Sequence, residues 1–208
     1  MAGASDVLCV LLAGGQGRRL GVADKALAEV RGRSLIARAI DRLRPQAAAI
    51  LINANGDASR FSAFGLPVAG DAIAGLAGPL AGVLTGLEYA RDRMNGVEAV
   101  ATLAADTPFA PFDYVTRLVA ARAEWGADIA VAASLGRRHH VDALWPVALA
   151  PALRAALAEE GLRKVEAFAN RYRRVEVEWS AEPCDPFFNV NTPGDIREAE
   201  TLALRLDL

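Results

Sequence analysis

The feature that most constrains this chain is an apolar run near its start that ends at two glycines. Val7–Ala13 is continuously apolar and of strand length. Such a run is typical of a strand at the centre of a parallel sheet, where both faces are covered. Gly14 and Gly15 follow at once, and glycine lets the backbone approach a ligand so closely that successive N–H groups converge on an anion. We therefore expect a strand that opens into a phosphate-binding loop.

Positive charge gathers around the same loop. Arg18, Arg19 and Lys25 follow the two glycines closely, and guanidinium and ammonium groups are suited to phosphate oxygens. We expect Lys25 and Arg19 to hold phosphates, with Lys25 contributing more as charge develops in a transition state. Arg18 is expected to face solvent. The alternative for Lys25 is a solvated loop cation, which is the usual environment of a lysine.

Strand-like and helix-like segments alternate along the rest of the chain. Strands are expected at residues 47–53, 66–69, 97–103, 127–133, 141–146 and 173–179, the last as a half-exposed antiparallel strand. Helices are expected at residues 34–44, 79–93, 111–125, 148–159, 163–169 and 195–206, and a short helix or turn at 57–64. The alternation predicts an α/β fold, a three-layer αβα sandwich with a mostly parallel, Rossmann-like sheet. Polar clusters that follow several strands should then converge beyond the carboxyl ends of those strands.

Composition narrows the class of protein. The 208 residues carry a net charge of −2, so no basic field suggests a nucleic-acid partner. The sequence has two cysteines, Cys9 and Cys184, which lie far apart in the chain. This favours buried thiols over a disulfide or a metal site. The sequence has neither a signal-like start nor a membrane-length apolar run, so we expect a cytoplasmic protein without a membrane partner. The adjacent His139 and His140 should face opposite sides of a strand, which argues against a metal or acid–base pair.

Asp106 is the strongest single candidate for chemistry. It follows the apolar strand at residues 97–103, at the sheet edge where ligands gather. A carboxylate there can hold Mg²⁺, which bridges triphosphate oxygens and neutralises the charge on a leaving pyrophosphate. The alternative is an aspartate that stabilises its own turn. Asn53 and Asp71 offer donors and acceptors for a base or ribose, and a carboxylate can accept the paired N–H groups of guanine. Both residues are equally compatible with ordinary loop chemistry.

The string LAGGQGRRLGVADK, from Leu12 to Lys25, resembles the start of nucleotidyltransferases with a nucleoside-diphospho-sugar transferase type of fold. Its LAGG, the later Asp-Thr-Pro at Asp106, and the octet GLAGPLAG at residues 75–82 resemble the molybdenum cofactor guanylyltransferase (MobA) family in particular. Three positions depart from that family. Val22 stands where a second glycine is usual, and Ala104-Ala105 replace the usual Pro-Cys.

The resemblance implies roles for individual residues. The implied nucleotide-binding residues are Leu12, Ala13, Gly14, Gly15, Lys25, Asn53, Asp71 and Asp106, of which Asp106 is also the metal ligand. Those implied to be catalytic are Lys25, Asp106 and Arg19. The implied acceptor-binding residues are Asn189 and Asn191 of FFNVNTPGD, with Arg163 and Lys164 of GLRKV. From sequence alone the two asparagines are equally explained as caps of the final helix, and the two cations as surface charges.

The implied reaction is transfer of GMP from GTP to molybdenum-molybdopterin, with Mg²⁺ as cofactor and pyrophosphate as second product. We expect a single domain, 1–208, with a nucleotide-binding half at 1–110 and an acceptor-binding half at 111–208. The implied partners are GTP, molybdenum-molybdopterin and, transiently, cofactor-insertion proteins or client molybdoenzymes. The alternatives are a related cytidylyl- or sugar-phosphate nucleotidyltransferase, and a non-catalytic chaperone of this fold that binds nucleotide or cofactor.

Overall fold

A computed structural model describes residues 6–15, 20–21, 24–75 and 78–208, so Arg18, Arg19 and Val22 lie outside the described residues. Within them, seven strands form one sheet in the order β5-β4-β1-β6-β8-β7-β9. The strands of this sheet are β1 (Val7–Leu12), β4 (Ala49–Asn53), β5 (Val68–Ala69), β6 (Ala99–Ala104), β7 (Ile129–Ser134), β8 (Arg137–Pro146) and β9 (Arg174–Trp179). The α-helices are α1 (Leu35–Leu43), α2 (Pro79–Arg93), α3 (Tyr114–Glu124), α4 (Ala150–Ala158), α5 (Val165–Ala169) and α6 (Pro193–Arg205).

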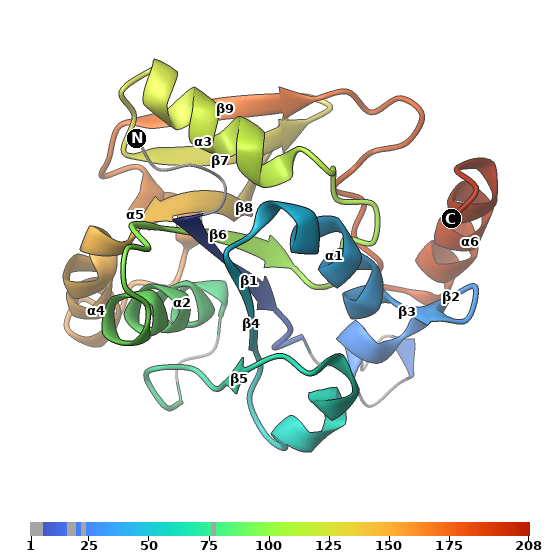
Figure 1. Cartoon of the computed structure of the whole chain (residues 1–208), viewed down its shortest axis with the longest axis horizontal. Coiled ribbons are helices and arrows are strands. Elements are labelled where there is room, and N and C mark those ends of the chain that lie inside the picture. The colour runs from blue at the N-terminus through green and yellow to red at the C-terminus, as the bar shows by residue number, and fades with distance from the viewer. Residues whose placement is uncertain (1–5, 16–19, 22–23, 76–77) are drawn as a thin grey trace.

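Strand β1 lies at the centre of this architecture, as its apolar run predicts. It pairs in parallel with β4 on one side and β6 on the other. Alternate side chains point to opposite faces of a strand, and both faces of β1 are covered. Val7, Cys9 and Leu11 pack with α1 and α3, whereas Leu8 and Val10 pack with α2, α4 and α5. Figure 1 shows the helices on the two faces of the sheet, which confirms the predicted three-layer α/β fold.

One strand direction was predicted wrongly. The segment at 173–179 was expected to be antiparallel, but β9 pairs in parallel with β7, from Ile129 opposite Arg174 to Ser134 opposite Trp179. The antiparallel strand within the described sheet is β8, which pairs in that direction with both β6 and β7. The alternation of apolar and charged residues in β9 reports that one face is buried, and carries no information about direction. The expected half-exposure is confirmed, because Val177 and Trp179 are buried whereas Glu176 and Glu178 are exposed.

A small hairpin near the N-terminus was not predicted. The strands β2 (Glu29–Val30) and β3 (Arg33–Ser34) pair with each other and not with the main sheet. The hairpin is anchored by a third apolar cluster, in which Val30 and Leu35 meet Ala199 and Ala203 of α6. Figure 1 shows α6 beside β2 and β3, at the edge of the molecule. The last helix is thereby held next to the segment that leads out of the glycine loop.

Helix α2 approaches the sheet so closely that only glycine fits at two of its contact points. A Cβ atom added to Gly82 would lie 2.3 Å from Asn53 Oδ1 and 2.6 Å from Leu12 Cδ2. One added to Gly86 would lie 2.6 Å from Val10 Cγ2. The glycine that ends the GLAGPLAG octet therefore allows the helix to pack on the ends of β1 and β4, where the polar residues gather.

We expect Gly82→Ala to destabilise the protein although alanine is the better helix former. Overpacking of a close contact costs about 1–3 kcal/mol, whereas the gain in helix propensity is about 1 kcal/mol. Urea unfolding measures the difference. Gly194→Ala in α6 is the matched control, because the nearest atom to its new Cβ, Thr192 Oγ1, is 3.4 Å away. A Gly82→Ala variant as stable as the control would contradict the close contact.

Candidate active site

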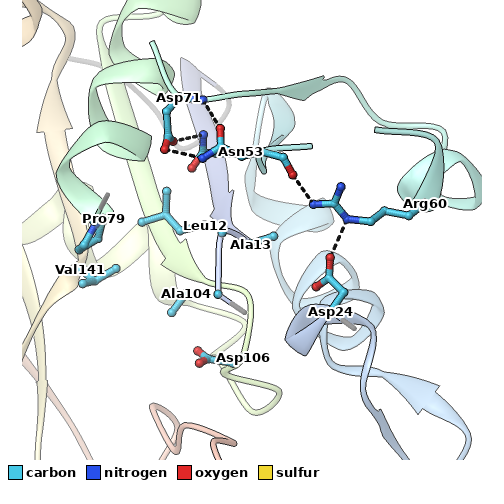
Figure 2. Close-up of a pocket in the computed structure, with 14 residues that line it drawn as sticks. Leu12, Ala13, Asp24, Asn53, Arg60, Asp71, Pro79, Ala104, Asp106 and Val141 are labelled. Atoms are coloured by element: carbon cyan, nitrogen blue, oxygen red, sulfur yellow. Dashed lines mark hydrogen bonds and ion pairs between the residues drawn. The ribbon is translucent and has the colours of Figure 1, made fainter. Parts of the chain in front are cut away.

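A cavity of about 720 Å³ opens at the carboxyl edge of the parallel strands (Figure 2). Its volume lies in the range of small-molecule sites. Most residues predicted to bind a nucleotide line it, namely Leu12, Ala13, Gly14, Gly15, Asn53, Asp71 and Asp106. Lys25 lines a smaller adjoining hollow that shares Asp106 with the cavity. The structure thus brings together residues from the ends of β1, β4 and β6, as the edge of a parallel sheet requires.

One end of the cavity carries a network of amides and a carboxylate. Asn53, which is 4% exposed, donates through Nδ2 to Asp71 Oδ1 over 3.0 Å. Asn55 Nδ2 donates to the other carboxylate oxygen over 2.7 Å, and Asn55 Oδ1 accepts the Asp71 N–H over 2.8 Å. Figure 2 shows Asn53 and Asp71 side by side at the cavity wall. The two residues predicted to read a base therefore form one rigid polar wall, with Asn55 as its third member.

The other end of the cavity holds a cation between oxygen atoms. The Lys25 ammonium is ion-paired with Asp106 Oδ2 and donates to Asn191 Oδ1 over 2.6 Å. Asn189 Nδ2 donates to Asp106 Oδ1 over 3.1 Å. Lys25 is thus not a solvated loop cation, since its side chain is 14% exposed. The four residues come from three distant parts of the chain and form a single charged cluster.

The late FFNVNTPGD motif is held so that its asparagines face Asp106. Val190 N–H donates to the Asp106 main-chain oxygen over 3.1 Å. Thr192 is the N-cap of α6 and forms a capping box with Asp195, which also accepts the Asn191 N–H over 2.7 Å. Because Thr192 and Asp195 cap the helix, the alternative role of the asparagines as helix caps does not apply. Their side chains are free to act on the Lys25–Asp106 pair.

The turn around Asp106 is closed by its neighbours and not by its own carboxylate. Thr107 donates through both its N–H and its hydroxyl to the Ala104 carbonyl, over 3.2 and 2.5 Å. The Ala105 N–H donates to the Leu12 carbonyl over 3.2 Å, which ties the turn to β1. The carboxylate of Asp106 is left for Lys25 and Asn189. This arrangement favours the functional interpretation of Asp106 over that of a turn-stabilising aspartate.

A second carboxyl group lies behind the first. Asp142 of β8 is 3% exposed and accepts the Ala104 N–H over 2.8 Å. Burial raises the pKa of Asp142 from 3.8 to about 7, although the hydrogen bond from Ala104 opposes the shift and the charge of Asp106 adds to it. The native state therefore binds more protons than the unfolded chain between these two values, and stability falls as pH rises through that range.

We expect Asp142→Asn to stabilise the protein at about pH 8 and to have no effect near pH 4, because the amide keeps the bond from Ala104 without a buried charge. The rise in the pKa of Asp142 from 3.8 to about 7 sets an upper bound of about 4 kcal/mol on the gain. Thermal unfolding in EDTA at both pH values measures it. Asp128→Asn, which removes a carboxylate that is 40% exposed, is the control. A gain independent of pH would contradict the buried carboxyl.

Three residues of the site make contacts that the sequence did not specify. Asp24 directly precedes Lys25, and its position in the sequence is equally compatible with an ion pair to Lys25 and with a turn-capping role. It caps the 3₁₀ helix η3 (Lys25–Leu27), but its ion pair is with Arg60. Asn55 belongs to the Asn-Ala-Asn stretch at residues 53–55, and this stretch is the sequence feature that could have indicated a role for Asn55 in the site. Arg60 lies in a polar turn with no pattern that distinguishes it from a surface arginine.

The remaining predicted residues lie elsewhere or outside the described part of the chain. Arg163 donates to the Leu157 and Leu162 carbonyls, over 3.1 and 2.8 Å, and Lys164 is exposed at the start of α5. Neither lines the cavity, so their acceptor-binding role stays a prediction, as does the role of Arg19 outside the described residues.

The two histidines do not make a catalytic site. His139 is buried beside Ser134, whose hydroxyl lies 2.8 Å from its Nε2 and donates to Asp185 over 2.7 Å. Ser134 is 1% exposed, so this trio offers no accessible nucleophile. Burial lowers the pKa of His139, and likewise that of His140, which faces Glu166 of α5 at 3.8 Å. The cluster therefore has a structural role.

The charged cluster of Lys25, Asp106, Asn189 and Asn191 is suited to a hard divalent metal ion that a substrate phosphate also binds. In the described residues, no group of three His, Cys, Asp or Glu side chains is placed to hold a metal ion alone. Asp106 nevertheless supplies a carboxylate that already holds a cation, and Asn191 turns an amide oxygen toward it. Mg²⁺ is commonly bound by one or two carboxylates together with substrate phosphates. The donor set is compatible with that mode.

A nucleotide-sized cavity that runs from an amide-lined wall to an ammonium–carboxylate pair is suited to nucleotidyl transfer. Residues 9–175 match the family described as MobA-like NTP transferase domain, so the chain is a nucleotidyltransferase. It is 54% identical over 196 residues to a protein named molybdenum cofactor guanylyltransferase from Rhodopseudomonas palustris (strain BisB5), covering 94% of this chain and 93% of that relative. A protein of the same name from Bradyrhizobium sp. (strain ORS 278) is 48% identical, over 95% of this chain and 93% of its own length. The chain belongs to the molybdenum cofactor guanylyltransferase family.

Solved structures share the fold at low sequence identity. Molybdopterin-guanine dinucleotide biosynthesis protein A from Archaeoglobus fulgidus matches with a TM-score of 0.74 at 22% identity, over 96% of this chain and 99% of that one. A 4-diphosphocytidyl-2C-methyl-D-erythritol synthase from Anaerococcus prevotii matches with a TM-score of 0.70 at 14% identity, over 96% of both chains. A Mycobacterium tuberculosis protein solved in complex with manganese matches with a TM-score of 0.67 at 18% identity, over 94% of this chain and 98% of that one. No helix in the part of the chain that the structure describes has the length and apolarity to cross a membrane.

Proposed function

We propose that this protein transfers GMP from GTP to molybdenum-molybdopterin, forming the guanine dinucleotide of the cofactor and pyrophosphate. Full-length similarity to proteins named for this activity supports the proposal. The observation that carries it is the position of the Asn53–Asp71 wall and the Lys25–Asp106 pair at opposite ends of one cavity. A nucleotide bound by its base at the first would extend its phosphates toward the second.

Asp71 is the proposed guanine reader. Its two carboxylate oxygens are aligned by Asn53 and Asn55, and a carboxylate accepts the paired N1–H and 2-amino groups of guanine. Cytosine presents no such pair of donors. This difference supports GTP over CTP as substrate and makes the cytidylyltransferase alternative testable at a single residue.

The proposed chemistry needs no general base, because the attacking group is a phosphate that is already ionised. Its oxygen forms a bond to the α-phosphorus of GTP, the bond to the β-phosphate breaks, and pyrophosphate leaves with the electron pair. Lys25 stabilises the charge that develops on the phosphates, and the N–H groups of Gly14 and Gly15 are the proposed loop donors. A divalent cation bound at Asp106 would neutralise triphosphate charge. We propose Mg²⁺, while the manganese complex noted above concerns a relative of low identity.

The acceptor is proposed to bind on the side of Asn189 and Asn191. These residues come from the second half of the chain, where Asn189 donates to Asp106 and Asn191 accepts from Lys25. Their position supports a nucleotide-binding half at 1–110 and an acceptor-binding half at 111–208 within one domain. Arg163 and Lys164 remain proposed contacts of the acceptor, and transfer to insertion proteins or client molybdoenzymes remains a proposed later step. A cytoplasmic location stays a prediction.

The test is pyrophosphate release with each nucleoside triphosphate, in the presence of Mg²⁺ and the metal-loaded pterin cofactor. Release selective for GTP, with the dinucleotide as product, is the expected result. Selectivity for CTP would keep the reaction type and overturn the assignment of Asp71. Tight GTP binding with no turnover on any acceptor would overturn the enzyme proposal in favour of a binding chaperone.

A further inference from the structure

Arg60 joins two parts of the cavity wall that are far apart in sequence. Its Nε donates to Asp24 Oδ2 over 2.6 Å, and its Nη2 donates to the Asn55 carbonyl over 2.8 Å. Its Nη1 donates to the Asp57 carbonyl. Arg60, Asp24 and Asn55 all line the cavity, and Figure 2 shows the arginine side chain reaching to Asp24. One planar group therefore contacts both the segment that leads into Lys25 and the loop that carries the base-side amides.

The arginine is held in place by a rigid turn. It lies in the 3₁₀ helix η5 (Ala58–Phe64), and the next residue, Phe61, is fully buried in the core. Asp57 caps the start of this turn by accepting the Ser59 N–H over 2.9 Å. The guanidinium carbon lies over the Phe61 ring, 4.6 Å from its centroid. These contacts fix where the guanidinium lies before any ligand arrives.

The two loops depend on Arg60 to different degrees. Asn55 is anchored independently, because its side chain makes two hydrogen bonds to Asp71. The carboxylate of Asp24 makes one other hydrogen bond among the described residues, from the Ala26 N–H over 3.0 Å, which caps the turn that begins at Lys25. Loss of Arg60 would therefore loosen the Lys25 side and leave the base-side wall in place.

This ion pair differs from an ordinary surface pair. The side chains of Arg60 and Asp24 are 26% and 11% exposed, whereas fully exposed pairs contribute little to stability and hold no fixed geometry. The planar fork of arginine is held at three acceptors, which lysine does not reproduce. Arg171 provides the comparison in this chain. It pairs with Glu160 and lies over Phe168, but the pair is exposed and outside the cavity.

We propose that Arg60 is a positioning residue, which acts through Asp24 to set the distance between the base-side wall and Lys25. The inference rests on the proposed function, since it assumes that one nucleotide spans both ends of the cavity. A displacement of a reacting group by about 1 Å can reduce the rate by about 10²-fold. Arg60 thus determines whether a nucleotide held by its base also places its phosphates at the ammonium.

The experiment compares the affinities for GTP and GMP, without the pterin, in Arg60→Met, Asp24→Asn, the double variant and the matched control Arg171→Met. Loss of alignment should weaken the affinity for GTP about 10-fold. The affinity for GMP, which lacks the β- and γ-phosphates, should stay within about 2-fold of wild type, because the base-side wall is intact. Asp24→Asn keeps the bond from Ala26 and should reproduce the effect. The double variant should be no weaker than Arg60→Met, because both substitutions break one linkage. In the transfer reaction, kcat should fall more than KM rises.

Several outcomes would overturn the proposal. Equal losses for GTP and GMP would mean general weakening of the fold, and additive losses in the double variant would mean that Arg60 does not act through Asp24. Behaviour like that of Arg171→Met would mean no positioning role. Arg60→Lys replaces Arg60→Met if the latter does not fold, and should lose the same selectivity for GTP in part. A wild-type protein that binds GTP but transfers nothing contradicts the proposed function alone, because the binding comparison still tests Arg60.

Discussion

Asp106→Asn is expected to reduce GMP transfer by about 10³-fold or more, while the affinity for GTP in the absence of divalent metal changes little. The asparagine keeps the size of the side chain and can still interact with Asn189, but it removes the negative charge that faces Lys25. A lost electrostatic contact at the reacting phosphate costs about 3–4 kcal/mol of transition-state stabilisation, and loss of the proposed metal ligand adds to that. The base-side wall at Asn53 and Asp71 lies at the other end of the cavity and is unaffected.

Single-turnover transfer and equilibrium GTP binding separate the two effects. The control is Asp128→Asn, since Asp128 precedes β7 at the opposite edge of the sheet and accepts the Arg173 N–H over 3.0 Å. The control should transfer at the wild-type rate. An Asp106→Asn variant with transfer within about 10-fold of wild type would show that this carboxylate neither holds the metal nor organises the phosphates, and would remove the centre of the proposed mechanism.

Much of the fold was predictable because the signals for it are local. The apolar run of β1 predicts a central strand, and Pro79 marks the first turn of α2, which ends at Arg93 as expected. The helix expected at residues 195–206 is α6, whose start at Pro193 is capped by Thr192 and Asp195. The predicted direction of β9 was wrong, because alternation of residue types within one strand carries no information about how that strand is oriented relative to its neighbour. The β2–β3 hairpin was missed because each of its strands has two residues.

The site was predictable where a residue type has few other uses at a strand end. Asp106 follows β6 and Asn53 is the last residue of β4, and the parallel sheet brings them to one edge. The bonds between predicted residues were not predictable, because they depend on side chains that meet across the fold, as Lys25 meets Asn191. Arg60 gave no signal, since its role depends on Asp24, which lies on another loop. The sequence therefore indicates which segments form the site, whereas the contacts between their side chains follow only from the tertiary structure.

Lys25→Met is expected to reduce transfer by about 10²–10³-fold, the cost of removing one electrostatic donor at the reacting phosphates, and at the same time to tighten metal binding in the absence of nucleotide. In this structure the Lys25 ammonium is paired with the Asp106 carboxylate, which we propose as metal ligand, and it also donates to Asn191 Oδ1. A divalent cation that arrives without nucleotide must therefore compete with Lys25. With GTP bound, the phosphates offer the ammonium a new partner and leave Asp106 for the metal, so nucleotide and metal should bind cooperatively.

Mn²⁺ titration followed by electron paramagnetic resonance tests this exchange without any turnover. The chain has one other lysine, Lys164, which is exposed and outside the cavity, so Lys164→Met is the matched control for metal binding. Lys25→Met should bind Mn²⁺ more tightly than wild type without GTP and should gain less affinity when GTP is added. Mn²⁺ affinity that is unchanged or weaker in Lys25→Met would mean that the ammonium and the metal do not share Asp106. Lys25 would then act on the phosphates from its present position, and the pair with Asp106 would be a fixed part of the active site and not a contact that the substrates exchange.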